Sequence, residues 1–260
     1  MMFPLSGHRY PSPWYTPYKF RELARILALP FDPHNLLPQH GRWLDERIVE
    51  YPWMFSRLPQ GPGRLLDAGS VLNFATLLRH PLIKDKDLTI MTLAPEENCF
   101  CRRGVSYIYA DLRSIPFRDE HFDYIACIST LEHIGLDNTL LYTRDPATKE
   151  SAPESYLVAV KEIRRVLRPG GSLLLTVPFG RREVRSWIQV FDTYAIERIL
   201  EIFAPEKACE LYFRYHAGQG WRLSSRDAAA DARYFDFRTD LPWPGRPVAA
   251  EAVACLELHK

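Results

Sequence analysis

The chain has 260 residues, enough for one large α/β domain with its own hydrophobic core. Hydrophobic residues make up 47% of the sequence and charged residues 25%, as in an ordinary globular protein. The 33 basic and 32 acidic residues leave a formal net charge of +1, which argues against a protein whose main partner is nucleic acid or an anionic membrane. No apolar run approaches the ~20 residues that span a bilayer, so no membrane span is expected.

The cysteines and the N-terminal residues indicate the compartment. Cys127 and Cys255 lie inside apolar runs, while Cys99 and Cys101 form a pair with no second pair nearby. Neither a disulfide framework nor a zinc site is expected from this arrangement. The first 20 residues are rich in proline and aromatic residues and lack the apolar stretch of a signal peptide. We therefore expect a cytoplasmic location and no bound metal.

Residues 1–60 are expected to form an N-terminal helical extension or lid, followed by the main domain at residues 61–260. Apolar residues at helical spacing predict helices over residues 18–29 and 44–58. Pro30 and Pro33 end the first of them. The aromatic side chains of this extension suit a lid over a pocket and a hydrophobic flap equally well; they are Tyr10, Trp14, Tyr15 and Tyr18.

From residue 64 onward, short apolar strands alternate with helices. Strands are predicted at residues 64–66, 88–93, 105–110, 124–128 and 172–177. A helix is predicted over residues 151–168, where the Pro-Gly-Gly run at 169–171 is expected to stop it. A helix at 193–203, strands at 208–215 and 252–258, and a long loop at 224–247 complete the pattern. This alternation predicts an α/β fold with a parallel sheet wound in right-handed crossovers.

Ligands of such a sheet bind outside the carboxyl ends of its strands. The first predicted strand runs into Asp67 and Gly69, and a glycine there lets a ligand approach the backbone closely. The third strand ends at Asp111, and the fourth ends at Ser129, shortly before His133. From the residues alone, Asp67 is also interpretable as a loop cap and Asp111 as a turn residue.

Four segments in this order carry a family resemblance: residues 64–70, 109–115, 121–135 and 162–178. Residues 162–175, EIRRVLRPGGSLLL, and the FDYI run at 122–125 are close to the usual forms of that family. The sequence resembles the class I S-adenosylmethionine (SAM)-dependent methyltransferases. The resemblance implies a Rossmann-like doubly wound sheet, mostly parallel with a C-terminal antiparallel hairpin, and SAM as the cofactor.

The resemblance also implies a place for each strand end along the cofactor. The first strand end lies along the methionine and ribose, the third holds the adenine with the Asp111 carboxylate reaching the exocyclic amine, and the fourth lies beneath the sulfonium. The cofactor-binding residues implied are Asp67, Ala68, Gly69, Ser70, Thr92, Leu93, Asp111, Leu112, Ile128 and Ser129.

The sequence departs from the family pattern at two of these strand ends. Val71 stands where a further glycine is usual, so it is expected to crowd the ligand. Thr92 stands where an acid usually holds the ribose hydroxyls, and a hydroxyl lacks the bidentate grip of a carboxylate. Glu96 or Glu97 is an alternative source of that acid; otherwise Thr92→Asp is expected to tighten SAM binding.

His133 is the candidate general base, because histidine suits proton transfer near neutral pH and this position follows the fourth strand. Glu132 is the second catalytic candidate, since it is placed to orient His133 or to cap a helix N-terminus. A structural Glu-His pair that opens the next helix is the alternative. The following loop supplies three candidates for the acceptor pocket, namely Asp137, Asn138 and Tyr142.

The segments at 66–70, 92–96 and 129–138 further resemble a bacterial subgroup associated with surface-polysaccharide or secondary-metabolite genes. This resemblance implies O-methylation of a small-molecule or glycan hydroxyl. The alternative is a catalytically silent domain that serves as a binding or partner subunit, which the departures at Val71 and Thr92 favour. A nicotinamide dehydrogenase is disfavoured, because no G-x-G-x-x-G run follows the first strand.

Overall fold

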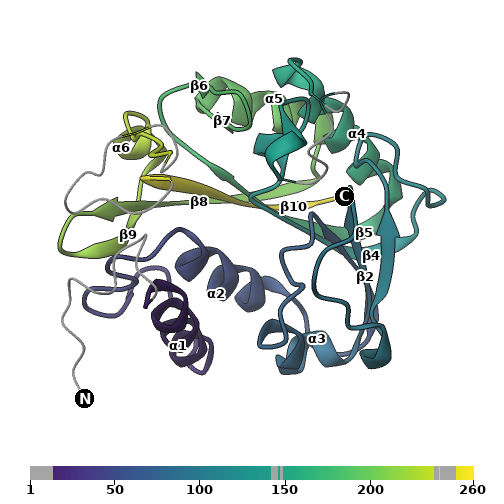
Figure 1. Cartoon of the computed structure of the whole chain (residues 1–260), viewed down its shortest axis with the longest axis horizontal. Helices are drawn as coiled ribbons and strands as arrows, with labels where there is room; N and C mark the ends of the chain where they lie inside the picture. Colours follow the sequence, from purple (N-terminus) through teal and green to yellow (C-terminus); the bar gives the residue numbers. More distant parts are fainter. Residues whose placement is uncertain (1–13, 142–145, 147–148, 237–239, 241–249) are drawn as a thin grey trace. The chain divides into compact units, whose positions relative to one another are not determined.

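A computed structural model describes residues 14–141, 146, 149–236, 240 and 250–260 (Figure 1). Its helices are α1 (Tyr15–Leu27), α2 (Arg47–Arg57), α3 (Pro81–Lys84), α4 (Tyr156–Val166), α5 (Thr193–Phe203) and α6 (Arg226–Ala229). Short 3-10 helices are η2 (Leu77–Arg79), η3 (Cys101–Arg103), η4 (Leu131–His133), η5 (Asn138–Leu140) and η7 (Pro153–Ser155). The strands are β1 (Gly63–Ala68), β2 (Lys86–Thr92), β3 (Ser106–Tyr109), β4 (Phe122–Ile128), β5 (Leu167–Pro178), β6 (Glu183–Val184), β7 (Gln189–Val190), β8 (Lys207–His216), β9 (Gly220–Ser224) and β10 (Ala252–His259).

The strands form one eight-stranded sheet in the order β3-β2-β1-β4-β5-β10-β8-β9, while β6 pairs with β7 separately. Strands β1 to β5 pair in parallel. Backbone hydrogen bonds join positions 170 and 260, and positions 179 and 252, so β10 runs antiparallel to β5. Bonds between positions 206 and 259, and 215 and 251, make β10 antiparallel to β8 as well. The sheet is therefore mostly parallel with an antiparallel C-terminal part, as predicted.

The chain divides into two compact units. Unit 1 comprises residues 1–56, 178–181 and 211–255, and unit 2 comprises residues 57–177, 182–210 and 256–260. Strands β5, β8 and β10 have residues in both units. The domain boundary expected after residue 60 stays a prediction.

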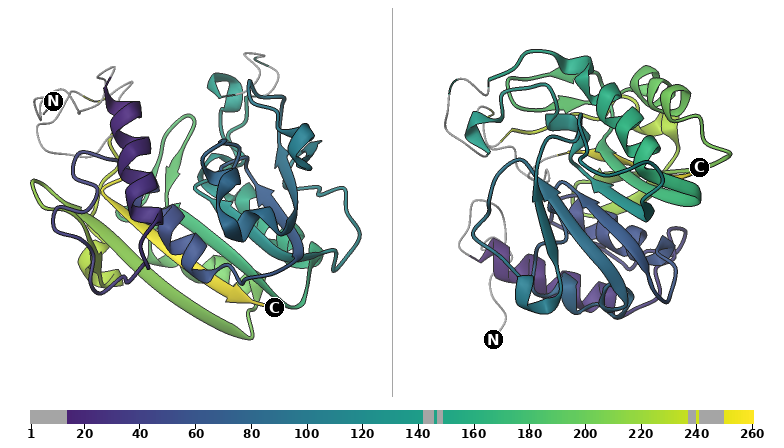
Figure 2. Two further views of the ribbon diagram at one scale, coloured as in Figure 1. Left: turned by 90° about the horizontal axis from the view of Figure 1, so that it is seen from below. Right: turned by 90° about the vertical axis from the view of Figure 1, so that its right-hand side faces the viewer.

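Unit 2 contains the strand order that creates a ligand site. Strands β2 and β3 lie on one side of β1 and strand β4 on the other, so the order reverses between β1 and β4. Helices α4 and α5 lie side by side on one face of the sheet, and α3 lies on the other (Figures 1 and 2). Helix α4 forms because Tyr156, Val160 and Ile163 recur on one face and are buried there, while its charged residues stay outside.

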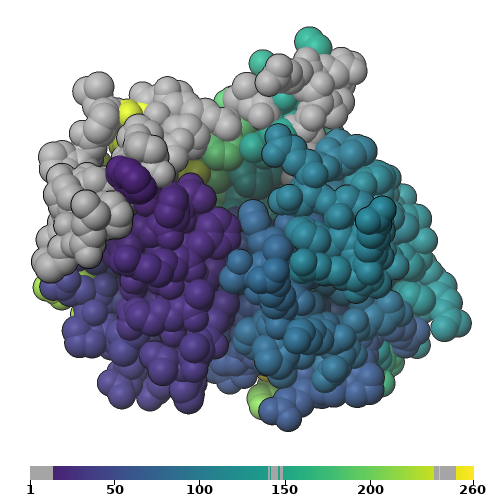
Figure 3. All heavy atoms as spheres, turned by 60° about the horizontal axis from the view of Figure 1, so that its bottom comes forward, coloured from purple at the N-terminus to yellow at the C-terminus, as the bar shows by residue number. Residues whose placement is uncertain are grey.

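Unit 1 packs α1 and α2 around large buried side chains. Trp53 and Trp221 are 1% and 0% exposed, and the Trp221 indole donates to the carbonyl of Leu44 at 3.0 Å. The Tyr15 phenol donates to the Asp45 carboxylate at 2.8 Å. Helix α1, purple in Figure 3, contributes its outer face to the surface of this unit. Strands β8 and β9 form an antiparallel hairpin here, with Tyr215 opposite Trp221.

Two of the four N-terminal aromatic residues named above, Tyr15 and Tyr18, have defined contacts in unit 1. Tyr15 is 6% exposed, and the Tyr18 phenol donates to the carbonyl of Arg42 at 3.3 Å. Trp14 is 50% exposed, and Tyr10 lies outside the described residues. Tyr15 and Tyr18 are therefore packing residues of unit 1, which favours the hydrophobic-flap interpretation for these two positions.

Most predicted elements of the sheet are confirmed, but the helix predicted over residues 151–168 is too long. Helix α4 ends at Val166, and the Pro-Gly-Gly run lies inside β5. There the pairing with β4 shifts, from Phe122 opposite Leu167 to Tyr124 opposite Ser172. Gly170 has φ of +70°, a backbone conformation that L side chains rarely adopt. The glycines therefore form an irregularity in a strand and do not stop a helix.

The segment predicted as a long loop, residues 224–247, also contains regular secondary structure. Strand β9 ends at its first residue and helix α6 lies within it. Residues 237–239 and 241–249 of that loop lie outside the described part of the chain. Among the described residues, no helix has the length and apolar character needed to cross a membrane.

Candidate cofactor-binding site

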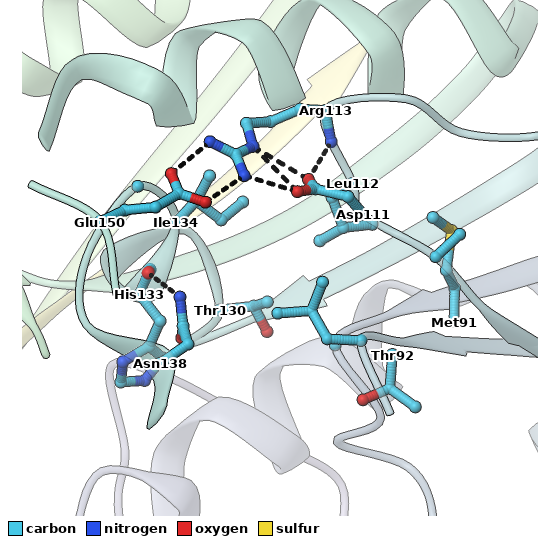
Figure 4. A pocket seen from close by; sticks show the side chains of 14 residues that line it. Met91, Thr92, Asp111, Leu112, Arg113, Thr130, His133, Ile134, Asn138 and Glu150 are labelled. Carbon is cyan, nitrogen blue, oxygen red and sulfur yellow. Dashed lines mark hydrogen bonds and ion pairs between the residues drawn. The ribbon is translucent and has the colours of Figure 1, made fainter. Parts of the chain in front are cut away.

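A cavity of about 350 Å³ opens in unit 2 at the carboxyl ends of β1, β2, β3 and β4 (Figure 4). Its volume falls in the range of ~300–1,000 Å³ that is common for small-molecule sites. The lining residues are Gly69, Met91, Thr92, Leu93, Ala110, Asp111, Leu112, Arg113, Thr130, His133, Ile134, Gly135, Asn138 and Glu150.

The buried Asp67 carboxylate holds the turn after β1 through hydrogen bonds. Asp67 is 0% exposed, and its carboxylate accepts hydrogen bonds from the backbone N–H groups of Val71 at 3.2 Å and Leu72 at 2.8 Å. Val71 itself is buried and does not line the cavity. That it crowds the ligand stays a prediction. Asp67 shapes the turn and is likewise absent from the cavity wall.

Gly69 forms the part of this turn that faces the cavity. Its φ is +125°, and an added Cβ would lie 2.0 Å from Oγ1 of Thr130, which follows β4. Only a glycine therefore allows the turn after β1 to lie against the segment after β4. This contact sits at the point where the strand order reverses.

The end of β2 carries a carboxylate on the following loop. Glu96 accepts hydrogen bonds from Ser70 Oγ at 2.8 Å and Asn73 Nδ2 at 3.0 Å. The Thr92 hydroxyl lies 3.4 Å from Glu96 Oε1. Of the two alternatives named from the sequence, Glu96 therefore lies beside Thr92. A second carboxylate at position 92 would repel it, which reverses the expected effect of Thr92→Asp.

The end of β3 carries a guanidinium that holds two carboxylates. Arg113 bonds to Asp111 through Nε and Nη2, with a shortest distance of 2.6 Å, and to both oxygens of Glu150 at 2.6 Å (Figure 4). Burial opposes ionisation of Asp111, but its hydrogen bonds and ion pair with Arg113 outweigh this and lower the pKa of that carboxyl. Hydrogen bonds to Glu150 and Asp111 raise the pKa of Arg113. Asp111 and Arg113 therefore both stay charged at neutral pH.

His133 lies at the end of η4 and is half-buried in the cavity wall. Its Nδ1 is 2.9 Å from the carbonyl oxygen of Trp187, and its ring stacks on the Trp187 ring with centroids 5.3 Å apart. Because a carbonyl only accepts, Nδ1 carries the proton in this bond. In the neutral ring the lone pair is then on Nε2.

Glu132, unlike His133, lies outside the cavity wall. It is 2% exposed and does not line the cavity. The acceptor that the structure places beside His133 Nδ1 is the Trp187 carbonyl, so Glu132 is not the partner in that bond. Its charge and that of Asp67 add to the effect of burial in raising the pKa of the Cys127 thiol. Glu132 belongs to the interior beneath the site.

Of the acceptor-pocket candidates, Asn138 lines the cavity and its amide donates to the carbonyls of His133 at 3.0 Å and Leu136 at 3.1 Å. Asp137 instead accepts from the backbone and hydroxyl of Thr139 at 3.2 and 2.5 Å. Tyr142 lies outside the described residues. Asn138 thus fixes the backbone that carries His133.

The cavity brings together seven of the residues proposed from the sequence: Gly69, Thr92, Leu93, Asp111, Leu112, His133 and Asn138. The remaining cofactor-binding and catalytic candidates, Asp67, Ala68, Ser70, Ile128, Ser129 and Glu132, do not line it. Arg113, Thr130 and Glu150 were missed. The charge of Arg113 two residues after Asp111 was a usable signal, whereas nothing local marks Glu150, which lies 37 residues further along the chain.

In the described parts of the chain, no group of three or more His, Cys, Asp and Glu side chains is arranged to hold a metal ion. The thiols of Cys99 and Cys101 lie 3.0 Å apart on an exposed loop, outside the cavity wall. No step of the chemistry is assigned to them.

Comparison with known proteins bears on the same segment. Residues 85–175 match the model of the methyltransferase domain family. This range contains the ends of β2, β3 and β4 that line the cavity. Residues 85–175 are thus similar to the methyltransferase domain family, whose members transfer the methyl group of SAM to an acceptor. SAM is the cofactor that this match indicates.

Individual relatives are distant. A fatty-acid O-methyltransferase of Mycolicibacterium smegmatis is 29% identical over 93 residues, which are 34% of this chain and 27% of that protein. An uncharacterised protein of Methanocaldococcus jannaschii is 33% identical over 70 residues, 27% of this chain and 22% of its own length. The chain thus spans about a quarter of the length of these curated relatives.

The fold is shared over nearly the whole chain. A solved structure of a SAM-dependent methyltransferase from Thermotoga maritima aligns with 95% of this chain and 97% of its own, with a TM-score of 0.51 and 13% sequence identity. This likeness supports the fold.

The residues of the cavity fit SAM. The missing Cβ of Gly69 leaves room beside the backbone turn, and Leu93 and Leu112 offer apolar walls. Polar groups stand at the ends of three different strands, as orientation of a small polar ligand requires. When bound, SAM supplies an activated methyl group on a sulfonium.

Proposed function

We propose that the chain transfers the methyl group of SAM to a hydroxyl oxygen of a small-molecule or glycan acceptor, with His133 as the general base. The observation that carries the proposal is the common cavity. Gly69, Asp111 and His133 come from the ends of three strands and line one space of about 350 Å³. We also propose that the protein acts in the cytosol.

The cofactor site proposed here runs along the carboxyl ends of β1 to β4. Gly69 and the turn held by Asp67 serve the methionine and ribose portion, and Glu96 serves the ribose hydroxyls in place of an acid at position 92. Leu93 and Leu112 take the purine between them. Ile128 and Ser129 contribute the backbone of the fourth strand end, where Ser129 N donates to Thr176 O at 3.0 Å and fixes its course.

His133 removes the proton of the acceptor hydroxyl. A neutral hydroxyl is a poor nucleophile, so a base that takes its proton as the carbon–oxygen bond forms lowers the barrier. Nε2 receives this proton, while Nδ1–H stays on the Trp187 carbonyl and keeps the ring in one orientation. The oxygen takes the methyl group, the carbon–sulfur bond breaks, and S-adenosylhomocysteine leaves as the second product.

An oxygen acceptor is supported by two lines. The fatty-acid O-methyltransferase of Mycolicibacterium smegmatis shares a segment with this chain. The strand-end segments resemble a subgroup associated with surface-polysaccharide or secondary-metabolite genes, which implies a hydroxyl acceptor. The wall beside His133 combines apolar Ile134 with the polar Asn138, which suits an acceptor of mixed character.

Titration calorimetry with S-adenosylhomocysteine tests the first half of the proposal. Binding of one molecule per chain is expected, and the absence of binding to the folded protein would support the silent-domain alternative. The second half is tested with isotopically labelled SAM and a panel of small hydroxylated acceptors and glycans. Label on oxygen, located by mass spectrometry, is expected; label on nitrogen or carbon would contradict O-methylation.

A further inference from the structure

Asp111 and Glu150 are not equivalent acceptors, although both line the cavity and share Arg113. The Asp111 carboxylate accepts from Arg113 Nε at 3.1 and 3.0 Å, from Nη2 at 2.6 Å and from the Arg113 backbone N–H at 2.7 Å. A carboxylate offers about four lone-pair positions. The single hydrogen on Nε is shared by both oxygens, so three N–H groups of Arg113 occupy three of the four acceptor positions of Asp111.

Glu150 keeps acceptor capacity for a ligand. Arg113 Nη1 donates to Oε2 and Nη2 donates to Oε1, each at 2.6 Å, so each oxygen retains a second lone-pair position. The Glu150 side chain is 35% exposed and lines the cavity. The bidentate pair with Arg113 fixes the plane of this carboxylate before a ligand arrives.

The ion pair also places Glu150 at a defined end of the cavity. Arg113 Nη2 bonds to both carboxylates, so Glu150 lies at the end of β3 although it comes from the segment between β4 and β5 (Figure 4). His133 follows β4, on the other side of β1 in the sheet order. In the cofactor orientation proposed above, the purine lies beside Leu93 and Leu112, and Arg113 lines the same cavity.

We propose that Glu150, and not Asp111, accepts the hydrogen bond from the exocyclic amine of the SAM adenine. This inference rests on the proposed function and assigns a recognition residue to its cofactor site. Asp111 then acts by holding Arg113, which in turn holds Glu150. An ionised acceptor on the amine strengthens that bond and selects an amino-purine over purines that lack the donor.

The test compares two ligands on each variant. S-adenosylhomocysteine and its analogue with hydrogen in place of the exocyclic amine are titrated by calorimetry into the wild type, Glu150→Ala and Asp111→Ala. The ratio of the two dissociation constants is the readout. Because both ligands meet the same protein sample, a loss of folded fraction affects both titrations alike.

The wild type is expected to bind the amine-bearing ligand about 10–100-fold more tightly. Glu150→Ala is expected to reduce this ratio to near one, while Asp111→Ala keeps most of it. Glu154→Ala is the matched control, because Glu154 lies on the same segment, pairs with Arg182 at 3.1 Å and does not line the cavity. It should keep the full ratio.

Three results would overturn the assignment: an unchanged ratio in Glu150→Ala, a ratio lost in Asp111→Ala to the same or a greater extent, or a wild-type ratio near one. In each of them the wild type still binds S-adenosylhomocysteine, so the proposed cofactor site stands. A wild type that binds neither ligand would instead overturn the proposed function, and this inference with it.

Discussion

The cavity of unit 2 and the surroundings of α2 in unit 1 contain the same kinds of side chain in different settings. At the cavity, Arg113 joins two carboxylates whose side chains are each 35% exposed. Around α2, Arg47 pairs with Glu50, whose side chain is 0% exposed. The difference teaches that a charged cluster by itself does not mark a site. The cluster that we propose to be functional differs from the structural one because it lines the cavity at the carboxyl ends of the strands.

His133 and His40 differ in the same way as these two charged clusters. His133 lines the cavity with Nδ1 on the Trp187 carbonyl. His40 is 2% exposed, and its Nε2 lies 3.2 Å from the carbonyl of Ile48. Burial lowers the pKa of His40 to about 4, against a partial opposing effect of the bond to Ile48. Burial thus keeps His40 uncharged in the interior.

The largest expected effect separates these two residues. His133→Ala should lower turnover by ~10²–10⁴-fold while the affinity for S-adenosylhomocysteine stays the same, because the base acts only in the chemical step. Steady-state rates with an acceptor from the hydroxyl panel measure this. His40→Ala is the matched control and should lower the free energy of unfolding without changing the turnover of the folded fraction. Equal losses of turnover in both variants would remove the contrast.

The next effect concerns the ion pair of α2. Glu50→Ala leaves the Arg47 guanidinium without its partner and should lower the free energy of unfolding by about 2–4 kcal/mol, somewhat below the cost at fully buried pairs because Arg47 is partly exposed. Urea unfolding measures this. Glu150→Ala should cost less than 1 kcal/mol, since its pair with Arg113 is partly exposed. A larger stability loss at Glu150 than at Glu50 would show that the two clusters were assigned the wrong way round.

Substitutions of Glu96 and Thr92 test which of these two positions binds the ribose hydroxyls of SAM. Glu96→Gln should weaken SAM binding by about 10–30-fold, because the charged acceptor for the ribose hydroxyls is lost. Thr92→Asp should not tighten binding, since the new carboxylate would stand beside Glu96. Titration calorimetry with both variants decides whether Glu96 or position 92 binds the ribose hydroxyls. Tighter binding by Thr92→Asp would return the ribose-binding role to position 92.

The smallest effect is a pH dependence of stability in unit 1. Burial, with the charges of Asp45 and Glu50, raises the pKa of Glu46 to about 7. An unfolded Glu loses its proton near pH ~4.3, so between that pH and 7 the folded chain binds more protons and stability falls as pH rises. Glu46→Gln should remove this loss and stabilise the protein by about 1–2 kcal/mol at pH 7.5 but little at pH 4.5. A gain equal at both pH values would contradict the shift.

The sheet was largely predictable because its strands are short apolar runs that end in turn residues, and Gly69 and Asp111 mark two of those ends. The irregularity at Pro169-Gly170-Gly171 was not, because the same residues stop helices and interrupt strands. Strand β9 was missed since it is five residues long and pairs only at the sheet edge.

For the site, strand-end residues were predictable and side-chain direction was not. Asp67 and Gly69 are two residues apart, yet only the glycine lines the cavity, because the Asp67 carboxylate turns inward to the N–H groups of the turn. The Arg113–Glu150 pair joins positions 37 residues apart. No periodicity in the sequence connects two such positions.

A crystal structure with S-adenosylhomocysteine tests the central claim most directly. We predict that the ligand lies across the carboxyl ends of β1 to β4, with its backbone-facing part against Gly69, its purine beside Leu93 and Leu112, and its sulfur on the side of His133. A ligand bound at another place on the chain, or no ligand at saturating concentration in a folded protein, would contradict the account.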